Sequence, residues 1–229
     1  MKILITGSNG QVGFELCRAL SVFGQILAPT RQELDLSDAQ AVADYLKQEQ
    51  PDLIANAAAY TAVDKAETYV AQARRLNAEL PAQFAAYAKA NNIRLVHYSS
   101  DYVYPGTGSE AFSEASETGP LGVYGLTKLE GDQVISASGC EHLIFRTSWV
   151  YSARGNNFMK TMLRLAQDKS SLNIVGDQIG SPTPARLIAQ ITALAVHSKM
   201  PSGLYHLASR GETSWHGFAQ AIFKQALIS

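Results

Sequence analysis

The residues with the most suggestive chemistry in this chain are a tyrosine and a lysine four positions apart. Tyr124 and Lys128 stand in the string Tyr-Gly-Leu-Thr-Lys, the only Tyr-x-x-x-Lys pair in the sequence. On a helix, residues four apart share one face. A tyrosine, with a pKa of about 10, is a slow acid near neutrality, but a nearby ammonium stabilises its anion and lowers that pKa. The pair therefore predicts a tyrosine that exchanges a proton with a substrate oxygen.

Hydroxyl groups lie at the end of an apolar run upstream of this pair. The run from Arg94 closes with Tyr98-Ser99-Ser100-Asp101. A serine hydroxyl can polarise a carbonyl group, and reduction of a ketone needs a proton donor at the developing alkoxide as well as a hydride donor. Ser100, Tyr124 and Lys128 are therefore the predicted catalytic residues of a carbonyl reductase.

A site for a hydride-donating cofactor is predicted at the start of the chain. The apolar run Lys2 to Ile5 breaks into Thr6-Gly7-Ser8-Asn9-Gly10-Gln11-Val12-Gly13. A strand that ends in a glycine turn and opens a helix aims unpaired N–H groups at an anion. Gly7 allows the tight turn, Gly10 lets the phosphates approach, and Gly13 lets the helix lie close to the strand. The spacing is Gly-x-x-Gly-x-x-Gly, whereas many dehydrogenases have Gly-x-Gly-x-x-Gly.

The first 147 residues alternate short apolar runs with helical stretches, which predicts right-handed βαβ crossovers. The expected fold is α/β, a doubly wound, Rossmann-like parallel sheet covered on both faces, with ligands at the carboxyl ends of its strands. The predicted strands are Lys2 to Ile5, Gln25 to Ala28, Asp52 to Ala55, Arg94 to Ser99 and His142 to Arg146. The predicted helices are Gln11 to Val22, Asp38 to Gln48, Thr61 to Ala90 with an interruption near Pro81, and Tyr124 to Ser138.

The pattern changes after this stretch, so we predict a dinucleotide-binding domain over residues 1–147 and a small substrate-binding lobe over residues 148–229. The lobe's pieces are short and are expected to pack on the carboxyl edge of the sheet. They comprise a helix from Asn156 to Gln167, a strand from Leu172 to Val175, a helix ending at His197, a strand from Leu204 to Leu207 and a helix from Trp215 to Leu227.

Composition excludes several other classes of protein. An apolar content of 46% in 229 residues supports a packed core, and a formal net charge of −1 argues against a nucleic-acid surface. No apolar run is long enough to span a membrane. Cys17 and Cys140 fit neither a disulfide framework nor a metal spacing. We therefore expect no nucleic-acid or membrane partner and a cytoplasmic location.

Taken together, these motifs resemble the extended short-chain dehydrogenase/reductases, and within them the dTDP-4-dehydrorhamnose reductases. The resemblance covers essentially the whole chain. It implies hydride transfer from NAD(P)H to C4 of dTDP-6-deoxy-L-lyxo-4-hexulose, a nucleotide-sugar substrate, to give dTDP-L-rhamnose for cell-surface polysaccharides. Besides the glycine turn and the Tyr124/Lys128 pair, the strings that carry it are Asn56-Ala57-Ala58-Ala59-Tyr60-Thr61-Ala62-Val63-Asp64, Ser99-Ser100-Asp101-Tyr102-Val103-Tyr104, Arg146-Thr147-Ser148-Trp149-Val150-Tyr151 and Gly155-Asn156-Asn157-Phe158.

The resemblance also implies roles for individual residues. Tyr124 would be the proton donor, Lys128 would lower its pKa, and Ser100 stands where the family often has threonine. Substrate-binding residues would be Ser100, Asp101, Tyr124 and Trp149. The predicted cofactor-binding residues are Gly7, Gly10, Gln11, Val12, Gly13, Thr30, Arg31, Asp35, Leu36, Ala58, Ala59, Tyr60, Thr61, Tyr98 and Lys128.

The segment after the second predicted strand bears on the choice of cofactor. NAD-specific sites usually have an acidic residue there, which binds the ribose 2′-hydroxyl. Here the segment reads Ala28-Pro29-Thr30-Arg31. Arg31 could accept a 2′-phosphate and Thr30 could bond either form, so NADPH is favoured and NADH should be tolerated.

Two departures from the family pattern lead to further expectations. In some relatives glutamates hold Mg²⁺ between subunits, and Glu15 would match one of them. The position after Pro184-Ala185 carries Arg186 instead, so no metal site is predicted, although the resemblance still allows a homodimer. The chain also ends at Ser229, several dozen residues before the family does, and the substrate lobe is therefore expected to be incomplete.

Two other functions stay open. A sugar-nucleotide dehydratase or epimerase shares the fold, but a dehydratase commonly has Asp-Glu after the serine or threonine, whereas here Asp101 is followed by Tyr102. The second open function is non-catalytic. The regulatory subunit of methionine adenosyltransferase, a relative of this family, binds NADP and docks to a partner. Fold alone does not separate these functions.

Overall fold

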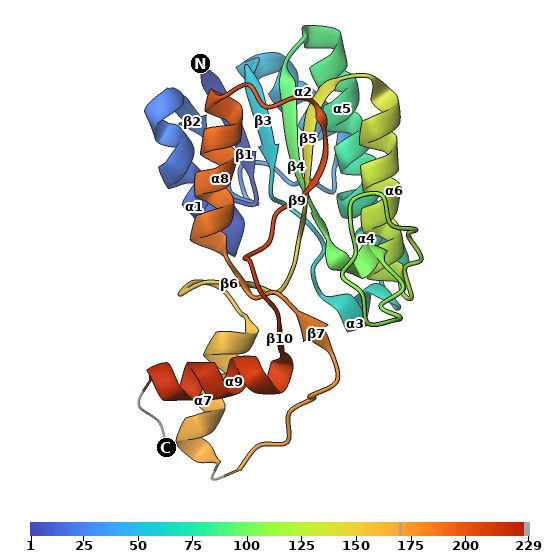
Figure 1. Cartoon of the computed structure of the whole chain (residues 1–229). Coiled ribbons are helices and arrows are strands. Elements are labelled where there is room, and N and C mark those ends of the chain that lie inside the picture. The colour runs from blue at the N-terminus through green and yellow to red at the C-terminus, as the bar shows by residue number, and fades with distance from the viewer. Residues whose placement is uncertain (170, 227–229) are drawn as a thin grey trace.

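A six-stranded parallel sheet lies at the centre of the computed structural model, which describes residues 1–169 and 171–226 (Figure 1). Every neighbouring pair in it is parallel, which confirms the predicted doubly wound fold. Such a sheet must be covered on both faces, and its inner strands are accordingly almost wholly buried. In sheet order the strands are β2 (Gln25–Leu27), β1 (Lys2–Thr6), β3 (Leu53–Asn56), β4 (Arg94–Ser100), β5 (Glu141–Thr147) and β9 (Gly203–His206).

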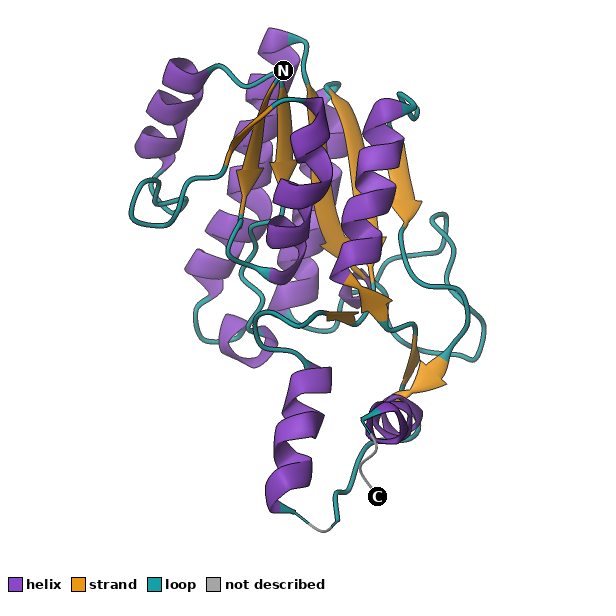
Figure 2. Cartoon of the chain, turned by 90° about the vertical axis from the view of Figure 1, so that its left-hand side faces the viewer, coloured by secondary structure: helices purple, strands orange, loops and turns teal. Residues whose placement is uncertain are grey.

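Helices cover both faces of this sheet (Figure 2). Because side chains alternate along a strand, Ile3 and Ile5 of β1 pack toward one helical layer and Leu4 toward the other. The first layer consists of α1 (Gln11–Leu20) and α8 (Ala185–His197), with a 3₁₀ turn at Ser21–Phe23. The second layer contains α2 (Ala39–Glu49), α5 (Leu80–Asn91) and α6 (Val123–Ser138).

The strand order places a crevice at the carboxyl end of β1. Strand β1 pairs with β2 on one side and with β3 on the other. The crossover from β1 to β2 and the crossover from β2 to β3 therefore run in opposite directions across the sheet. Parallel sheets bind ligands at such a switch point, outside the carboxyl ends of the strands. The turn after β1 and the segments after β3, β4 and β5 all meet at this edge.

The long helix predicted from Thr61 to Ala90 is divided differently from the prediction. It consists of α3 (Val63–Ala66), α4 (Val70–Arg74), a π-helical turn (Arg75–Glu79) and α5. Pro81 lies in the first turn of α5 and not at a break, because proline is tolerated there. The irregularity falls just before it, in the π-helical turn, a feature that often occurs at functional sites.

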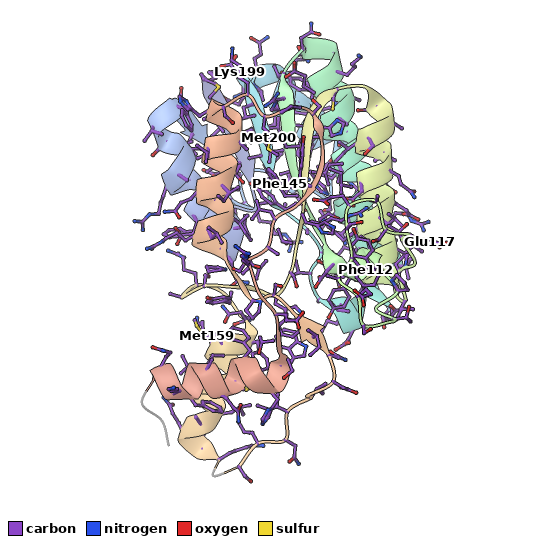
Figure 3. The ribbon with its side chains drawn as sticks, in the orientation of Figure 1. Phe112, Glu117, Phe145, Met159, Lys199 and Met200 are labelled. Atoms are coloured by element: carbon purple, nitrogen blue, oxygen red, sulfur yellow. The ribbon has the colours of Figure 1, made fainter. Side chains whose placement is uncertain are left out.

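The predicted small lobe is only partly separate from the sheet. Helices α7 (Phe158–Asp168) and α9 (Trp215–Gln225) pack on each other beyond the carboxyl ends of the strands, where Figure 3 labels Met159. Helix α8 and strand β9 come from the same range, 148–229, yet they belong to the sheet's layers: Ile188 and Ala189 lie in its core and β9 pairs with β5. A segment's place in the sequence therefore does not decide whether it packs with the lobe helices or with the sheet.

The segment 172–175 differs from its prediction as a strand. No strand forms at 172–175, because this segment has no ladder partner; instead the carbonyl of Val175 accepts a hydrogen bond from the backbone of His216. Leu227, the predicted end of the last helix, lies outside the described residues. Two short strand pairs, separate from the central sheet, form within residues 148–229: β6 (Val150–Tyr151) with β8 (Thr183–Pro184), and β7 (Ile179–Gly180) with β10 (Thr213–Ser214).

Candidate active site

A cleft of about 780 Å³ opens at the carboxyl ends of β1, β3, β4 and β5. It extends from the glycine turn to the start of α9. Of the predicted site residues, Gly13, Thr30 and Tyr60 do not line it. Those that do are Gly7, Gly10, Gln11, Val12, Arg31, Asp35, Leu36, Ala58, Ala59, Thr61, Tyr98, Ser100, Asp101, Tyr124, Lys128 and Trp149.

The glycine turn presents a helix N-terminus to this cleft. Gly10 is the N-cap of α1, and no side chain caps the helix, so the first backbone N–H groups face the cleft without an intrahelical acceptor. Gly7 has a φ of +68°, which favours glycine, and its carbonyl accepts the N–H of Gly10 at 2.9 Å. A Cβ on Gly10 would meet only that carbonyl, at 3.1 Å, and would otherwise point into open space. These residues fit a pyrophosphate.

The three predicted residues that do not line the cleft make contacts that support its walls. Gly13 lies directly under Gly7, where a Cβ would overlap the Gly7 carbonyl. The Thr30 N–H donates to the Glu33 carboxylate at 2.7 Å, which closes the turn after β2. The backbone of Tyr60 is held from outside the cleft, as described next.

Asn77, in the π-helical turn, fixes the segment after β3. Its side-chain oxygen accepts the N–H of Tyr60 at 2.8 Å, and its amide donates to the carbonyl of Tyr60 at 3.2 Å and to Thr127 Oγ1 at 3.1 Å. Asn77 is completely buried. It therefore ties the Ala58–Thr61 wall of the cleft to α6, which carries Tyr124 and Lys128. No sequence motif indicated this role.

The side chain of Gln11 supports the opposite wall. Its Oε1 accepts from Asn157 Nδ2 at 2.8 Å and from Ser152 Oγ at 3.2 Å, and its amide donates to the Val150 carbonyl at 3.4 Å. Gln11 was predicted to bind cofactor. Its backbone is placed to do so, while its side chain holds the 150–157 segment against the start of α1.

Ser100 and Tyr124 are brought together as predicted. Ser100 ends β4 beside the Tyr124 phenol, and its hydroxyl opposes the effect of burial on the pKa of that phenol. Burial dominates, however, and raises the pKa of Tyr124 to about 12. The ring of Tyr102 packs edge-on against Tyr124 at 5.5 Å. The phenol is therefore protonated throughout the neutral range.

Lys128 is the most unusual group in the cleft because it is a buried ammonium. Its Nζ donates to the Tyr98 carbonyl at 2.6 Å and lies 3.3 Å from His97 Nε2. Burial lowers the pKa of Lys128 to about 8, against the opposing charge of Asp132. In this structure the ammonium bonds the backbone of β4 rather than the Tyr124 phenol, whose pKa it was predicted to lower.

His97 and Tyr98 have side chains on opposite faces of β4. His97 is fully buried, and its other ring nitrogen bonds Asn56 Nδ2 at 3.1 Å. The Tyr98 hydroxyl bonds Thr192 of α8 at 2.8 Å. Tyr98 therefore reaches Lys128 through its carbonyl and not through its phenol.

Asp101 follows Ser100 and is largely buried at the edge of the cleft. It accepts hydrogen bonds from Ser100 Oγ at 3.0 Å and from Ser148 Oγ at 2.7 Å. Burial raises its pKa, and these two bonds oppose that effect. The carboxylate thereby orients the Ser100 hydroxyl.

Two tryptophans form the wall between the sheet and the α7–α9 pair. Trp149 follows β5 in a left-handed backbone conformation, with a φ of +44°, and stacks on Trp215 with ring centroids 3.5 Å apart. Gly180 packs beneath Trp149, where a Cβ would lie 2.5 Å from the indole. Trp149 was predicted to contact substrate. Trp215 was not predicted, and an aromatic residue at the start of a helix was the only signal for it.

The position predicted to lack a metal site holds an ion pair. Arg186 of α8 lies 3.5 Å from the Glu15 carboxylate of α1. In the part of the chain that the structure describes, no group of three His, Cys, Asp or Glu side chains is placed to hold a metal ion. Within the same residues, every helix is too short or too polar to cross a membrane.

Comparison with known proteins identifies close relatives. A family model described as RmlD substrate binding domain matches residues 1–229. A dTDP-4-dehydrorhamnose reductase of Burkholderia thailandensis is 47% identical over 97% of this chain and 77% of its own. A crystal structure of a dTDP-4-dehydrorhamnose reductase from Clostridium acetobutylicum has a TM-score of 0.95 at 37% identity, covering 100% of this chain and 81% of that one. The Bacillus anthracis reductase, solved in complex with NADP, has a TM-score of 0.94 at 34% identity, with the same coverage.

Proposed function

The chain belongs to the RmlD substrate binding domain family, and from that membership we propose that it reduces the C4 ketone of dTDP-4-dehydro-L-rhamnose to dTDP-L-rhamnose with NADPH. One observation carries the assignment of the site. Ser100, Tyr124 and Lys128 lie in the same cleft as the uncapped N-terminus of α1. A proton donor and an anion site of this kind are what a nicotinamide-dependent ketone reduction needs.

In this reaction a bound NADPH supplies the hydride, and the chain's own residues supply the rest. Tyr124 donates a proton to the oxygen at C4, and its raised pKa keeps that proton on the phenol until an alkoxide develops. Ser100 lies beside the Tyr124 phenol. Its hydroxyl donates to Asp101 in this structure and turns from that carboxylate to donate a hydrogen bond to the same substrate oxygen. The Lys128 ammonium places a positive charge at the base of the site, next to β4. The N–H groups at the start of α1 hold the pyrophosphate.

The Trp149–Trp215 stack is proposed to contact the nucleotide half of the substrate. We expect Trp215→Ala to raise KM for the sugar nucleotide by about tenfold or more, because removing a stacked aromatic wall costs at least about 1.4 kcal/mol of binding. kcat should change much less. Initial rates over a range of sugar-nucleotide concentrations measure both. Tyr69→Ala, which removes an exposed aromatic outside the cleft, is the matched control. An unchanged KM would limit Trp215 to packing.

Arg31 is proposed to select NADPH, since it lines the cleft after β2 and is exposed there. Arg31→Ala should weaken NADPH binding by about tenfold or more, because a charged hydrogen bond contributes about 1.5–3 kcal/mol, and should leave NADH binding almost unchanged. Fluorescence titration of both cofactors tests this, with the neighbouring exposed Gln32→Ala as control. Equal losses for the two cofactors would mean that Arg31 does not contact the 2′-phosphate.

The direct test of the function is a purified-protein assay. The 229-residue chain is mixed with NADPH and dTDP-4-dehydrorhamnose, and loss of reduced-nicotinamide absorbance is followed. Substrate-dependent oxidation supports the proposal. Saturable NADPH binding without oxidation would contradict it and would favour a non-catalytic, cofactor-binding subunit. We place the reaction in the reducing cytoplasm, in keeping with the free thiols of Cys17 and Cys140.

A further inference from the structure

The buried ammonium of Lys128 needs a counter-charge that the catalytic residues do not supply. Only 2% of the residue is exposed, and its direct partners, the Tyr98 carbonyl and His97, are both uncharged. Burial and the neighbouring ammonium keep the pKa of His97 well below its usual value, so the imidazole stays neutral. An ionised group buried without an opposite charge tends to lose its ionisation.

Asp132 lies one helical turn beyond Lys128 on α6 and is equally buried, with 2% exposure. Its Oδ2 accepts from Ser99 Oγ at 2.9 Å and from Arg146 Nε at 3.1 Å. Among the described residues its Oδ1 has no hydrogen-bond partner. No step of the proposed reaction uses this carboxyl group.

Arg146 of β5 favours the ionised form of Asp132. The guanidinium is itself buried, with 6% exposure, and its other contact is a hydrogen bond from Nη1 to the Tyr104 hydroxyl at 2.7 Å. A neutral Asp132 would leave two buried cations with no anion beside them, which is costlier than one shared carboxylate. Burial raises the pKa of Asp132, whereas Lys128, Ser99 and Arg146 lower it.

The remaining neighbours do not offer the same charge. Asp101 is the other buried carboxylate near the site, and its two oxygens are already engaged by Ser100 and Ser148. The titratable groups that act on Lys128 are His97 of β4 and Asp132 of α6. Beyond them, Arg146 of β5 acts on Asp132, and Asp101 and Tyr102, in the turn after β4, act on Tyr124.

We propose that Asp132 is a positioning residue that keeps Lys128 protonated through its buried negative charge, without contacting substrate or cofactor. The inference concerns the same site as the proposed reductase and, for its kinetic consequence, rests on that function. If the charged form of Lys128 is the active one, kcat falls as pH rises through its pKa, which is about 8. Removing the Asp132 charge lowers that pKa further and moves this basic limb to lower pH.

The test compares Asp132→Asn with Glu130→Gln. We expect Asp132→Asn to shift the basic limb of kcat downward by about one pH unit or more, since a nearby opposite charge moves a pKa by about 1–3 units. Glu130 is the matched control, because it is an acidic residue of the same helix that pairs at the surface with Arg74. The basic limb of the pH profile of kcat for Glu130→Gln should lie at the same pH as in the parent chain.

A second measurement does not depend on activity. The ε-carbon resonance of Lys128, in protein labelled with carbon-13 lysine and assigned through Lys128→Arg, reports the ionisation directly. Its midpoint should fall by a similar amount in Asp132→Asn. A folded variant with an unchanged Lys128 midpoint overturns the proposal. If the midpoint falls but the parent chain does not reduce the sugar, the charge pairing stands and the proposed function fails.

A double variant covers the case in which Asp132→Asn does not fold. Asp132→Leu with Arg146→Met removes the carboxylate and its buried cation together, and buried ion pairs are often replaced by apolar residues at little cost in stability. Loss of the Arg146 cation by itself raises the Lys128 midpoint, so the reference for this variant is Arg146→Met alone. Both lack the cation and only the double variant lacks the carboxylate, so its Lys128 midpoint should be the lower of the two. Equal midpoints in the two variants overturn the proposal.

Discussion

Tyr124→Phe is expected to lower kcat by ~10²–10⁴-fold, the usual contribution of a positioned general acid, and to leave NADPH affinity nearly unchanged. The ring stays in place, packed edge-on against Tyr102, and only the hydroxyl is lost. Because the alkoxide formed at C4 is far more basic than a phenolate, a pKa of about 12 does not hinder donation in the reducing direction. The same raised pKa would hinder the reverse oxidation, in which the phenol must first ionise.

Two measurements separate this explanation from a disturbed site. NADPH titration should give the same affinity for Tyr124→Phe as for the parent chain, while steady-state rates give the loss in kcat. Tyr102→Phe is the matched control, since it removes a phenol of the adjacent ring, which is 48% exposed. Full turnover by Tyr124→Phe, with a large loss in Tyr102→Phe, would place the proton donor on the neighbouring tyrosine.

Features that depend on local pattern could be predicted from the sequence. Gly7 needs a positive φ and Gly10 must lack a side chain, and both requirements are visible in the spacing of the glycines. The strands were recognised because a fully buried parallel strand is a short, continuous apolar run. The Tyr124/Lys128 pair was recognised because helical spacing places both residues on one face.

Contacts between distant segments could not be predicted in this way. Trp215 stacks on Trp149 only because the chain returns from β9 through β10 to the edge of the sheet. Nothing in the sequence around Asp132 distinguishes it from other acidic residues on helices. Its importance comes from two cations, Arg146 of β5 and Lys128 of α6, that the fold places near it. Nothing local distinguishes Asn77 from a surface asparagine, since its partners come from two other segments.

The strand wrongly predicted at 172–175 and the packing of α8 beside the sheet have a similar origin. The segment 172–175 has strand-like residues, but a strand also needs a neighbour with free backbone groups. Within the described residues, the neighbouring segment supplies the N–H of His216 and forms no ladder with 172–175. Helix α8 lies between α7 and α9 in the chain, yet its apolar face matches the layer of α1, so it packs beside the sheet. Sequence order predicted the elements, and burial decided where they pack.

Gly10→Val is expected to weaken NADPH binding by ~100-fold or more, which corresponds to about 2.7 kcal/mol. Gly10 has an extended backbone, with φ −78° and ψ 177°, so valine can adopt its conformation without strain. The new Cβ would lie 3.1 Å from the Gly7 carbonyl, and its methyl groups would occupy the cleft in front of the first N–H groups of α1. The loss therefore comes from steric exclusion of the phosphates and not from unfolding.

Cofactor fluorescence titration measures the loss, and circular dichroism checks that the variant is folded. Gly176→Val is the matched control, since a Cβ there makes only an ordinary contact, at 4.0 Å from His216, and lies outside the cleft. Gly13→Val, in contrast, should disturb the fold itself, because its Cβ overlaps the Gly7 carbonyl. A folded Gly10→Val that binds NADPH as tightly as the parent chain would mean that the pyrophosphate does not bind at the start of α1, and the cofactor would then have to enter the cleft in another orientation.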